Sequence, residues 1–189
     1  MARSLALALY LLAAGRRGTE PEPVRGDRPA GTLVWMHIGA GSGRKRLAQL
    51  ARRLVELRPG LSFLVTAEGP APPDAGGFPA ATVADRQPPE RTAAIAAFLD
   101  HWRPDLALFA GASLPPALLA GAHDRTIPLV LADIRMTAAD ERALRWRRAL
   151  ARSLLGRFAR VLAQDPETAG RLRDLGGRQL PVEIAGRIE

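Results

Sequence analysis

The sequence predicts an α/β protein with a Rossmann-like parallel sheet that is covered by helices on both faces. Two observations carry this prediction. Short apolar segments alternate with amphipathic segments from residue 32 onward. The apolar segments lack the period-two alternation of a half-exposed strand, as expected for parallel strands buried on both sides. With 189 residues, 47% of them hydrophobic, the chain is long enough to bury such a core as one domain.

Residues 1–17 are predicted to be a membrane-associating segment. An unbroken apolar run from Leu5 to Ala14 lies between Arg3 and the pair Arg16-Arg17. As a helix this run would rise about 15 Å, half of the hydrocarbon thickness, so it cannot span a bilayer. We favour a helix that dips into one leaflet, with a signal-peptide core or a helix packed on the domain as alternatives. Residues 18–31, rich in Glu, Pro, Arg and Gly, are predicted to be a linker.

Residues 32–189 are predicted to form the Rossmann-like domain. A first strand, 33–36, ends at His37 and leads through a glycine-rich loop into a helix at 44–57, whose leucines share one stripe. Further strands are expected at 61–66, 80–84, 106–110, 127–132, 161–163 and 182–184. Further helices are expected at 91–102, 115–123, 138–155 and 166–175, the third of these long or broken.

Arginine carries the positive charge of the chain. Lys+Arg number 27 against 19 Asp+Glu, giving a formal net charge of +8, and Lys45 is the one lysine. Between residues 135 and 160, eight arginines stand against two acids, a local net charge of 8 − 2 = +6. A coding bias toward arginine is the alternative explanation, but it would scatter the charge evenly. Guanidinium groups bind phosphate oxygens in pairs, so an anionic membrane surface or a phosphorylated small molecule is the expected partner.

Several other classes of function are disfavoured. Aromatic residues make up only 5% of the chain and no nucleic-acid-binding motif is present, so no nucleic-acid partner is expected. The sequence has no cysteine and its three histidines (37, 101 and 123) are far apart, so no metal is predicted. Ser42 and Ser113 have no base partner visible in the sequence, so no serine nucleophile is predicted. We expect no cofactor.

The glycine-rich loop after the first strand is a candidate anion site, because phosphates bind at helix N-termini. The named motifs do not match. A dinucleotide fingerprint would need glycine at position 44, where Arg44 stands, and a P-loop would need glycine directly before Lys45. Two interpretations remain, a structural tight turn and an anion-binding backbone nest made of Gly39, Gly41, Gly43 and Arg44.

Three stretches carry a resemblance to a known family. They are Trp35-Met36-His37, the segment His101-Trp102-Arg103-Pro104-Asp105 before an apolar strand, and 154–158 with 161–164. In these and in the order of its segments, nearly the whole chain resembles the N-terminal, acceptor-side half of 3-deoxy-D-manno-octulosonic acid (Kdo) transferases, which are two-domain glycosyltransferases of the GT-B type. The resemblance implies transfer of Kdo from CMP-Kdo to a lipid A precursor in lipopolysaccharide core biosynthesis, at the cytoplasmic face of the inner membrane, by a peripheral or monotopic protein.

The sequence departs from the family pattern at the positions that matter for chemistry. His37 fits the family motif His-x-x-Ser-x-Gly-Glu, but Gly43 stands where the presumed general base, a glutamate, should be. The motif Glu-Ser-Glu-Leu-Trp-Pro appears at residues 111–116 with only Leu114 and Pro116 retained. Arg135 does match the arginine of the segment Asn-Ala-Arg-Leu-Ser. The donor-binding domain would begin about where the given sequence ends.

We therefore predict no catalytic residue, and an acceptor- or anion-binding site at Gly39, Gly41, Gly43, Arg44 and Arg135. A positioned base contributes about 10²–10⁴-fold, and holding two substrates together about 7–11 kcal/mol, so the chain is not expected to catalyse alone. It is either an acceptor-side half completed by a separate donor domain, a non-catalytic module that binds anionic lipid or a partner protein, or a fragment of a decayed gene. His37 could be a core or a catalytic histidine, and Arg135 could bind phosphate or pair with Asp133 or Asp140.

Overall fold

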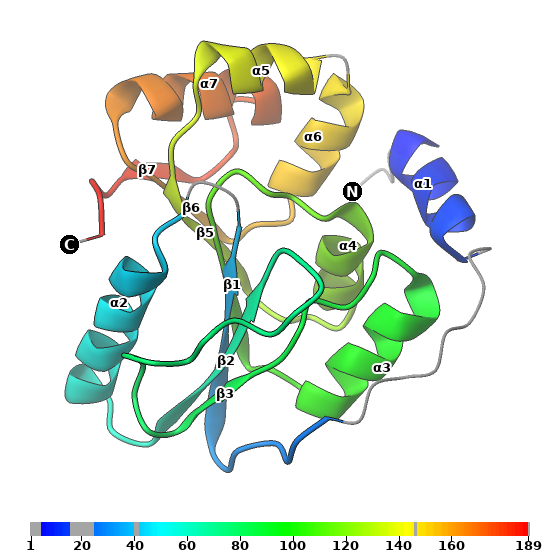
Figure 1. Ribbon diagram of the computed structural model, residues 1–189. Helices are drawn as coiled ribbons and strands as arrows, with labels where there is room; N and C mark the ends of the chain where they lie inside the picture. Colours follow the sequence, from blue (N-terminus) through cyan, green and yellow to red (C-terminus); the bar gives the residue numbers. More distant parts are fainter. Residues whose placement is uncertain (1–4, 16–24, 40–41, 146, 189) are drawn as a thin grey trace.

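The computed structural model describes residues 5–15, 25–39, 42–145 and 147–188. They contain a parallel seven-stranded sheet in the order β3-β2-β1-β4-β5-β6-β7 (Figure 1). The strands are β1 (Thr32–Ile38), β2 (Leu61–Ala67), β3 (Thr82–Ala84), β4 (Leu106–Ala110), β5 (Leu129–Ile134), β6 (Arg160–Ala163) and β7 (Val182–Ile184). The helices are α1 (Leu5–Gly15), α2 (Arg44–Leu57), α3 (Thr92–Trp102), α4 (Pro116–Asp124), α5 (Ala138–Arg145), α6 (Arg148–Leu155) and α7 (Pro166–Gly176).

Helices cover both faces of the sheet, which confirms the predicted Rossmann-like α/β fold. On one face, Leu47 and Ala51 of α2 pack against Val34, Met36 and Phe63 of β1 and β2. On the other face, the apolar sides of α3, α4, α6 and α7 join one larger cluster with the strands (Figure 1). Because parallel strands are joined by right-handed crossovers, the helix between β1 and β2 lies on the opposite face from those that follow β3.

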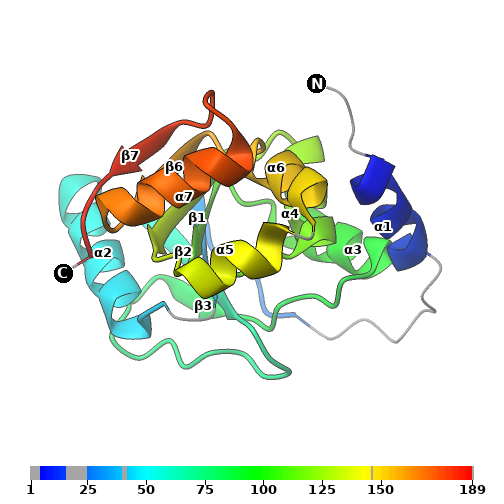
Figure 2. The same ribbon diagram turned by 90° about the horizontal axis from the view of Figure 1, so that it is seen from above.

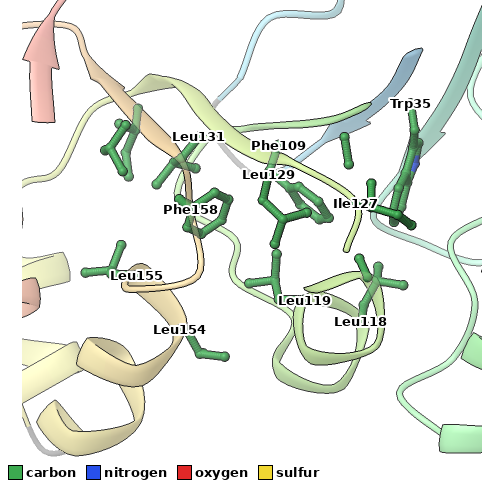
Figure 3. Close-up of a cluster of buried hydrophobic side chains, with 14 of the residues drawn as sticks. Trp35, Phe109, Leu118, Leu119, Ile127, Leu129, Leu131, Leu154, Leu155 and Phe158 are labelled. Atoms are coloured by element: carbon green, nitrogen blue, oxygen red, sulfur yellow. The ribbon is translucent and has the colours of Figure 1, made fainter. Parts of the chain in front are cut away.

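Aromatic rings form the centre of the larger cluster (Figure 3). The ring of Trp35 in β1 lies 5.3 Å from that of Phe98 in α3 and 5.1 Å from that of Phe109 in β4. Phe109 in turn meets Phe158, just before β6, at 6.2 Å. Trp35, Phe98 and Phe109 are fully buried, and each such side chain stabilises the fold by roughly 1.5–3 kcal/mol relative to an exposed one.

Both predicted boundaries of one strand are wrong, and the helix that was expected as long or broken is broken. The strand expected at 127–132 is shifted, because β5 starts after Pro128, which has no N–H to donate, and continues to Ile134 through an irregularity between Leu131 and Ile134. The helix expected at 138–155 is broken into α5, which ends at Arg145, and α6, which begins at Arg148.

The N-terminal helix α1 packs against α3, α4 and α6 (Figure 2). Leu7 and Ala14 are buried in these contacts, and the Tyr10 hydroxyl donates a 3.0 Å hydrogen bond to Glu90 Oε2. Leu5, Leu9 and Leu12 on the same helix are 75%, 59% and 58% exposed. In the described part of the chain, no helix is both long and apolar enough to cross a bilayer. Insertion of this helix into a leaflet stays a prediction.

The predicted linker is described only from residue 25, while residues 1–4, including Arg3, and 16–24, including the pair Arg16-Arg17, lie outside the described residues. Residues 25–31 have no helix or strand but are fastened to the domain. Arg28 Nε donates to the Trp102 carbonyl at 2.7 Å, and His101 Nε2 lies 2.9 Å from the Gly26 carbonyl.

Candidate functional site

The loops that follow β1 and β4 meet at the carboxyl edge of the sheet. The chain leaves β1 toward one face and β4 toward the other, and ligands of open parallel sheets bind at such a switch point. We call the surface formed by residues 39, 42–44 and 111–116 the β1/β4 crevice. Its two sides are in close contact: Gly39 N–H donates to the Ala110 carbonyl at 2.8 Å, and a Cβ on Gly39 would lie 2.7 Å from that oxygen. The close packing explains why residue 39 is glycine.

The N-terminus of α2 opens into the β1/β4 crevice. Ser42 turns back on the preceding loop, its Oγ donating to the Gly39 carbonyl at 2.7 Å. Gly43 is the N-cap of α2 and provides no side-chain oxygen to the first N–H groups of the helix. Uncapped N–H groups at a helix N-terminus attract anions. The anion-binding role of Gly39, Gly43 and Arg44 stays a prediction, as does that of Gly41, which lies outside the described residues.

The space beside Gly43 is filled by a guanidinium. A Cβ at position 43 would lie 2.8 Å from Arg46 Cζ. Arg46 Nε and Nη2 donate to Asp133 Oδ2 at 3.1 and 2.8 Å, and Gln164 Nε2 donates to Asp133 Oδ1 at 2.7 Å. The Asp133 carboxylate is fully buried and has both oxygens bonded, so it is poorly placed to take a proton from an acceptor hydroxyl.

Asp133 owes its orientation to an unusual backbone. Its φ of 49° lies in the left-handed region, at the irregularity in the β5–β6 pairing. Asp and Asn adopt this conformation more readily than other side chains. Side chains along a strand point alternately to the two faces of the sheet, and the left-handed conformation takes Asp133 out of this alternation. Its carboxylate then lies on the side of α2, where it meets Arg46.

The two candidate arginines lie in different surroundings. Arg44 fastens the neighbouring loop: its Nη1 donates to the carbonyls of Asp74 (2.9 Å) and Gly76 (2.7 Å) and lies 3.1 Å from Asp74 Oδ2. Arg135 is exposed and forms no ion pair with any described residue. The backbone N–H of Thr168, and to a smaller extent the charge of Arg135, lower the pKa of Asp165 at the start of α7.

The acids considered as partners for Arg135 bond elsewhere. Asp133 pairs with Arg46, and Asp140 accepts a 2.7 Å hydrogen bond from the Thr137 hydroxyl.

His37 is a core histidine. Its Nδ1 lies 2.9 Å from Thr66 Oγ1, which also accepts a 2.9 Å hydrogen bond from Trp35 Nε1. Burial lowers the pKa of His37 to about 4, although the nearby Glu68 carboxylate acts in the opposite direction. The ring is therefore neutral at physiological pH. Its Nε2 is buried without a hydrogen-bond partner among the described residues.

Two glutamates near the β1/β4 crevice were missed in the sequence analysis. Glu68 follows β2 directly, is exposed, and donates its backbone N–H to the Ile38 carbonyl at 3.3 Å. Its position immediately after a buried strand was the available signal. Glu90 caps α4, its carboxylate accepting from Ala117 N–H (2.7 Å) and Leu118 N–H (3.1 Å). No local pattern marks Glu90, because the helix that it caps begins 26 residues later in the chain.

A second charged surface lies beside α1. Figure 2 shows α6 between α1 and α5. We call the exposed leucines of α1, together with the exposed arginines of α5, of α6 and at position 147, the α1/α6 face. Leu9 and Tyr10 of α1 line one shallow pocket together with Arg147 and Arg148, so its apolar and cationic parts adjoin. The arginines of this face are Arg142, Arg145, Arg147, Arg148 and Arg152.

Most of these arginines have no acidic partner within the described residues. Arg145 pairs with Glu141 at 3.3 Å, and Arg148 donates to the Asp174 carbonyl at 2.9 Å. In the same part of the chain, no three His, Asp or Glu side chains gather in a way that could hold a metal ion.

The sequence and the fold were compared with known proteins. Residues 13–189 match the family model described as 3-deoxy-D-manno-octulosonic-acid transferase (kdotransferase). The match leaves out only the first twelve residues.

Solved structures with a similar fold include proteins bound to UDP or to a UDP-sugar. Staphylococcus aureus MnaA with UDP has a TM-score of 0.56 at 13% identity, covering 84% of this chain and 44% of that one. Neisseria meningitidis UDP-GlcNAc 2-epimerase bound to UDP-GlcNAc has a TM-score of 0.56 at 14% identity, with 82% and 46% covered. Anabaena Alr3699/HepE in complex with UDP-glucose has a TM-score of 0.53 at 15% identity, with 83% and 44% covered. This chain thus spans less than half the length of these proteins, and the likeness shows a shared fold.

Proposed function

The chain belongs to the Kdo transferase family, through its N-terminal domain, and from this membership we propose that it is the acceptor-side half of a Kdo-transferase-like glycosyltransferase. The reaction proposed for the complete enzyme is transfer of Kdo from CMP-Kdo to a lipid A precursor. In this proposal residues 32–189 bind the phosphorylated lipid acceptor, and a donor-binding domain supplies CMP-Kdo. The match to the family over residues 13–189 is the observation that carries the proposal.

The proposed acceptor contacts lie on the carboxyl edge of the sheet. The uncapped N-terminus of α2, with Gly39, Gly41 and Gly43 before it, offers N–H groups to a phosphate. Arg44 and Arg135 supply positive charge on the same edge. Arg135 is the stronger candidate for direct contact, because it is exposed and has no acidic partner among the described residues, whereas Arg44 already holds the 74–76 loop.

We further propose that this chain does not catalyse transfer by itself. An acceptor hydroxyl needs a base to become nucleophilic. At position 43, where the family carries a glutamate, the structure has the guanidinium of Arg46 neutralised by Asp133. His37 is buried, and Glu68 is an exposed acid that follows a different strand, β2, beside the crevice.

The membrane is the proposed place of action. A single apolar helix face gives only marginal binding, and nearby cations add attraction to anionic lipid. The α1/α6 face combines an apolar helix surface with nearby cations, since Leu9 of α1 adjoins Arg147 and Arg148. We propose peripheral or monotopic attachment to the cytoplasmic face of the inner membrane.

The test measures acceptor binding and turnover separately. Binding of the full chain to vesicles containing a bisphosphorylated lipid A precursor is compared with binding to phosphatidylglycerol vesicles of equal charge. We expect preference for the precursor, and a loss of that preference in Arg135→Gln. The matched control is Arg58→Gln, an exposed arginine at the opposite end of α2. Equal binding to both vesicles would reject an acceptor site.

Turnover is followed by mass spectrometry of the lipid after incubation with CMP-Kdo. No Kdo-modified product is expected from the chain alone. Measurable turnover would overturn the proposal of inactivity while leaving the family assignment untouched.

The second candidate is a non-catalytic module that binds anionic lipid. The pairing of Arg46 with Asp133 beside Gly43 favours it, because a neutralised guanidinium occupies this space and cannot take a proton from an acceptor hydroxyl. The same vesicle experiment separates the two: a module of this kind would bind precursor and phosphatidylglycerol alike and would still respond to salt.

A further inference from the structure

An apolar groove runs along α1, where this helix packs against α3 and α4. Its volume is about 600 Å³, within the range of about 300–1,000 Å³ typical of small-molecule sites. Leu7, Leu11 and Leu12 of α1 form one wall, and Ile95 and Ala96 of α3 lie opposite. The groove lies beside the α1/α6 face and away from the β1/β4 crevice.

The lining favours a flexible aliphatic ligand. The apolar side chains that line the groove are leucine, isoleucine and alanine, with no aromatic ring on which a planar ligand could stack. Leu12 lines the groove and is also 58% exposed, so an apolar chain bound there would remove leucine surface from water.

A cation with an unsatisfied donor stands in the same groove. Arg157 lines it, and its Nη1 lies 3.3 Å from His123 Nδ1. Arg157 Nε is buried and has no hydrogen-bond partner among the described residues. A buried N–H of an always-charged guanidinium without an acceptor is costly. Because the guanidinium has five N–H donors, a carboxylate in the groove can bind the others, and its negative charge compensates the cation.

The other charged groups of the groove are in different surroundings from Arg157. Arg125 pairs with Asp100 at 2.8 Å. Asp124 also lines the groove, but its side chain is 56% exposed, so water screens its charge. The charge that is partly removed from water in the groove is therefore the positive charge of Arg157, beside an aliphatic wall.

We propose that this groove binds one long-chain fatty acid, with the acyl chain along α1 and the carboxylate on Arg157. Charge complementarity selects this occupant over a neutral lipid, because a neutral head group would leave the Arg157 charge without a counter-ion. The proposal does not depend on sugar transfer, and its test uses neither CMP-Kdo nor a lipid A precursor.

The test is a titration of the delipidated full chain with a fluorescent C16 fatty acid below its micelle concentration, followed by displacement with palmitate, hexadecanol and octanoate. We expect one site per chain. Palmitate should displace the probe at least tenfold better than hexadecanol, which lacks the charge, and better than octanoate, which fills less of the groove. Hexadecanol competing as well as palmitate, or uptake of several probes per chain, would overturn the proposal.

Variants locate the site. Arg157→Gln should weaken binding at least tenfold, whereas the matched control Arg160→Gln, which alters an exposed arginine paired with Glu183, should leave it unchanged. Ala96→Phe, at a half-buried position of the wall, should fill the groove and abolish binding of the probe. Should Arg157→Gln fold poorly, Ala96→Phe and the head-group comparison on the unaltered chain decide the matter. Equal affinities in Arg157→Gln and Arg160→Gln, or undiminished binding in Ala96→Phe, would reject the site.

Discussion

The β1/β4 crevice and the α1/α6 face use arginine in opposite ways. Near the crevice, Arg46 pairs with a buried carboxylate and Arg44 donates to a neighbouring loop, so both side chains stabilise the fold. On the α1/α6 face, Arg142 and Arg147 are exposed and form no ion pair with any described residue. A count of arginines in the sequence does not separate these two roles.

The difference shows which cations can meet an external anion. The charge of an arginine bonded to a buried carboxylate is already compensated, and this arginine cannot leave without exposing an unpaired buried charge. An exposed arginine without an acidic partner keeps its charge available to an external anion. The exposed cations of the α1/α6 face can therefore meet an external anion. At the carboxyl edge, Lys45, Arg86 and Arg135 are exposed and form no ion pair with any described residue.

The largest effect should come from breaking the internal pair. Arg46→Ala leaves Asp133 buried with Gln164 as its remaining side-chain partner, and we expect a loss of about 3 kcal/mol in the free energy of unfolding. Urea denaturation measures it. The control, Arg53→Ala on the same helix, removes an exposed pair with Glu56 and should cost less than about 1 kcal/mol. Similar losses of unfolding free energy in both variants would contradict the distinction between an arginine paired with a buried carboxylate and one in an exposed pair.

The next effect concerns the α1/α6 face. Replacing both Arg142 and Arg147 with Gln should weaken binding to phosphatidylglycerol vesicles by about 2 kcal/mol, or roughly 30-fold, since each cation near an anionic surface contributes about 1 kcal/mol. Cosedimentation at low salt measures this, and added salt should reduce the difference. The control is Arg53→Gln on α2, the helix that covers the opposite face of the sheet. Binding unaffected by both the substitutions and salt would contradict the assignment of this face.

A smaller effect concerns the pH dependence of stability that the buried His37 causes. Burial lowers the pKa of His37 to about 4, whereas an unfolded histidine titrates near 6.5. Between these values the unfolded chain binds the extra proton, so stability rises with pH there. We expect a gain of about 1.5 kcal/mol from pH 5 to 6.5, measured by urea denaturation at each pH. His37→Asn should flatten this dependence, and an unchanged slope in the variant would show that another group is responsible.

The smallest effect concerns the attachment of α1. Tyr10→Phe removes the hydrogen bond to Glu90 and should lower the local stability of α1 by about 1 kcal/mol. Hydrogen exchange of the α1 amides reports this loss, with the β4 amides as an internal control. Faster exchange in both segments would mean that Tyr10 supports the whole domain rather than this contact.

The strands and the layer order could be predicted from the sequence because buried parallel strands are apolar throughout. The two boundary errors occurred where backbone geometry dominates: Pro128 delays the start of β5, and the irregularity at Asp133 extends it. The break between α5 and α6 was left open because polar residues continue through it without proline or glycine.

The candidate site was harder to predict, because its contacts join distant segments. Arg46 and Asp133 are 87 residues apart, and Tyr10 and Glu90 are 80 apart. Neither pair has a local pattern. The missing glutamate at position 43 could be identified from the sequence, but what stands in its place could not, since Arg46 reaches it by folding back along its own helix.

The left-handed turn of Asp133 restricts which residues a library could place there. Glycine and asparagine would fit the backbone, and asparagine would also keep an oxygen toward Arg46, whereas a branched residue such as valine would suit neither. In a deep mutational scan for soluble protein, the tolerated set at this position should be narrow and should favour asparagine, in contrast to the ordinary apolar preferences of its neighbours Ala132 and Ile134.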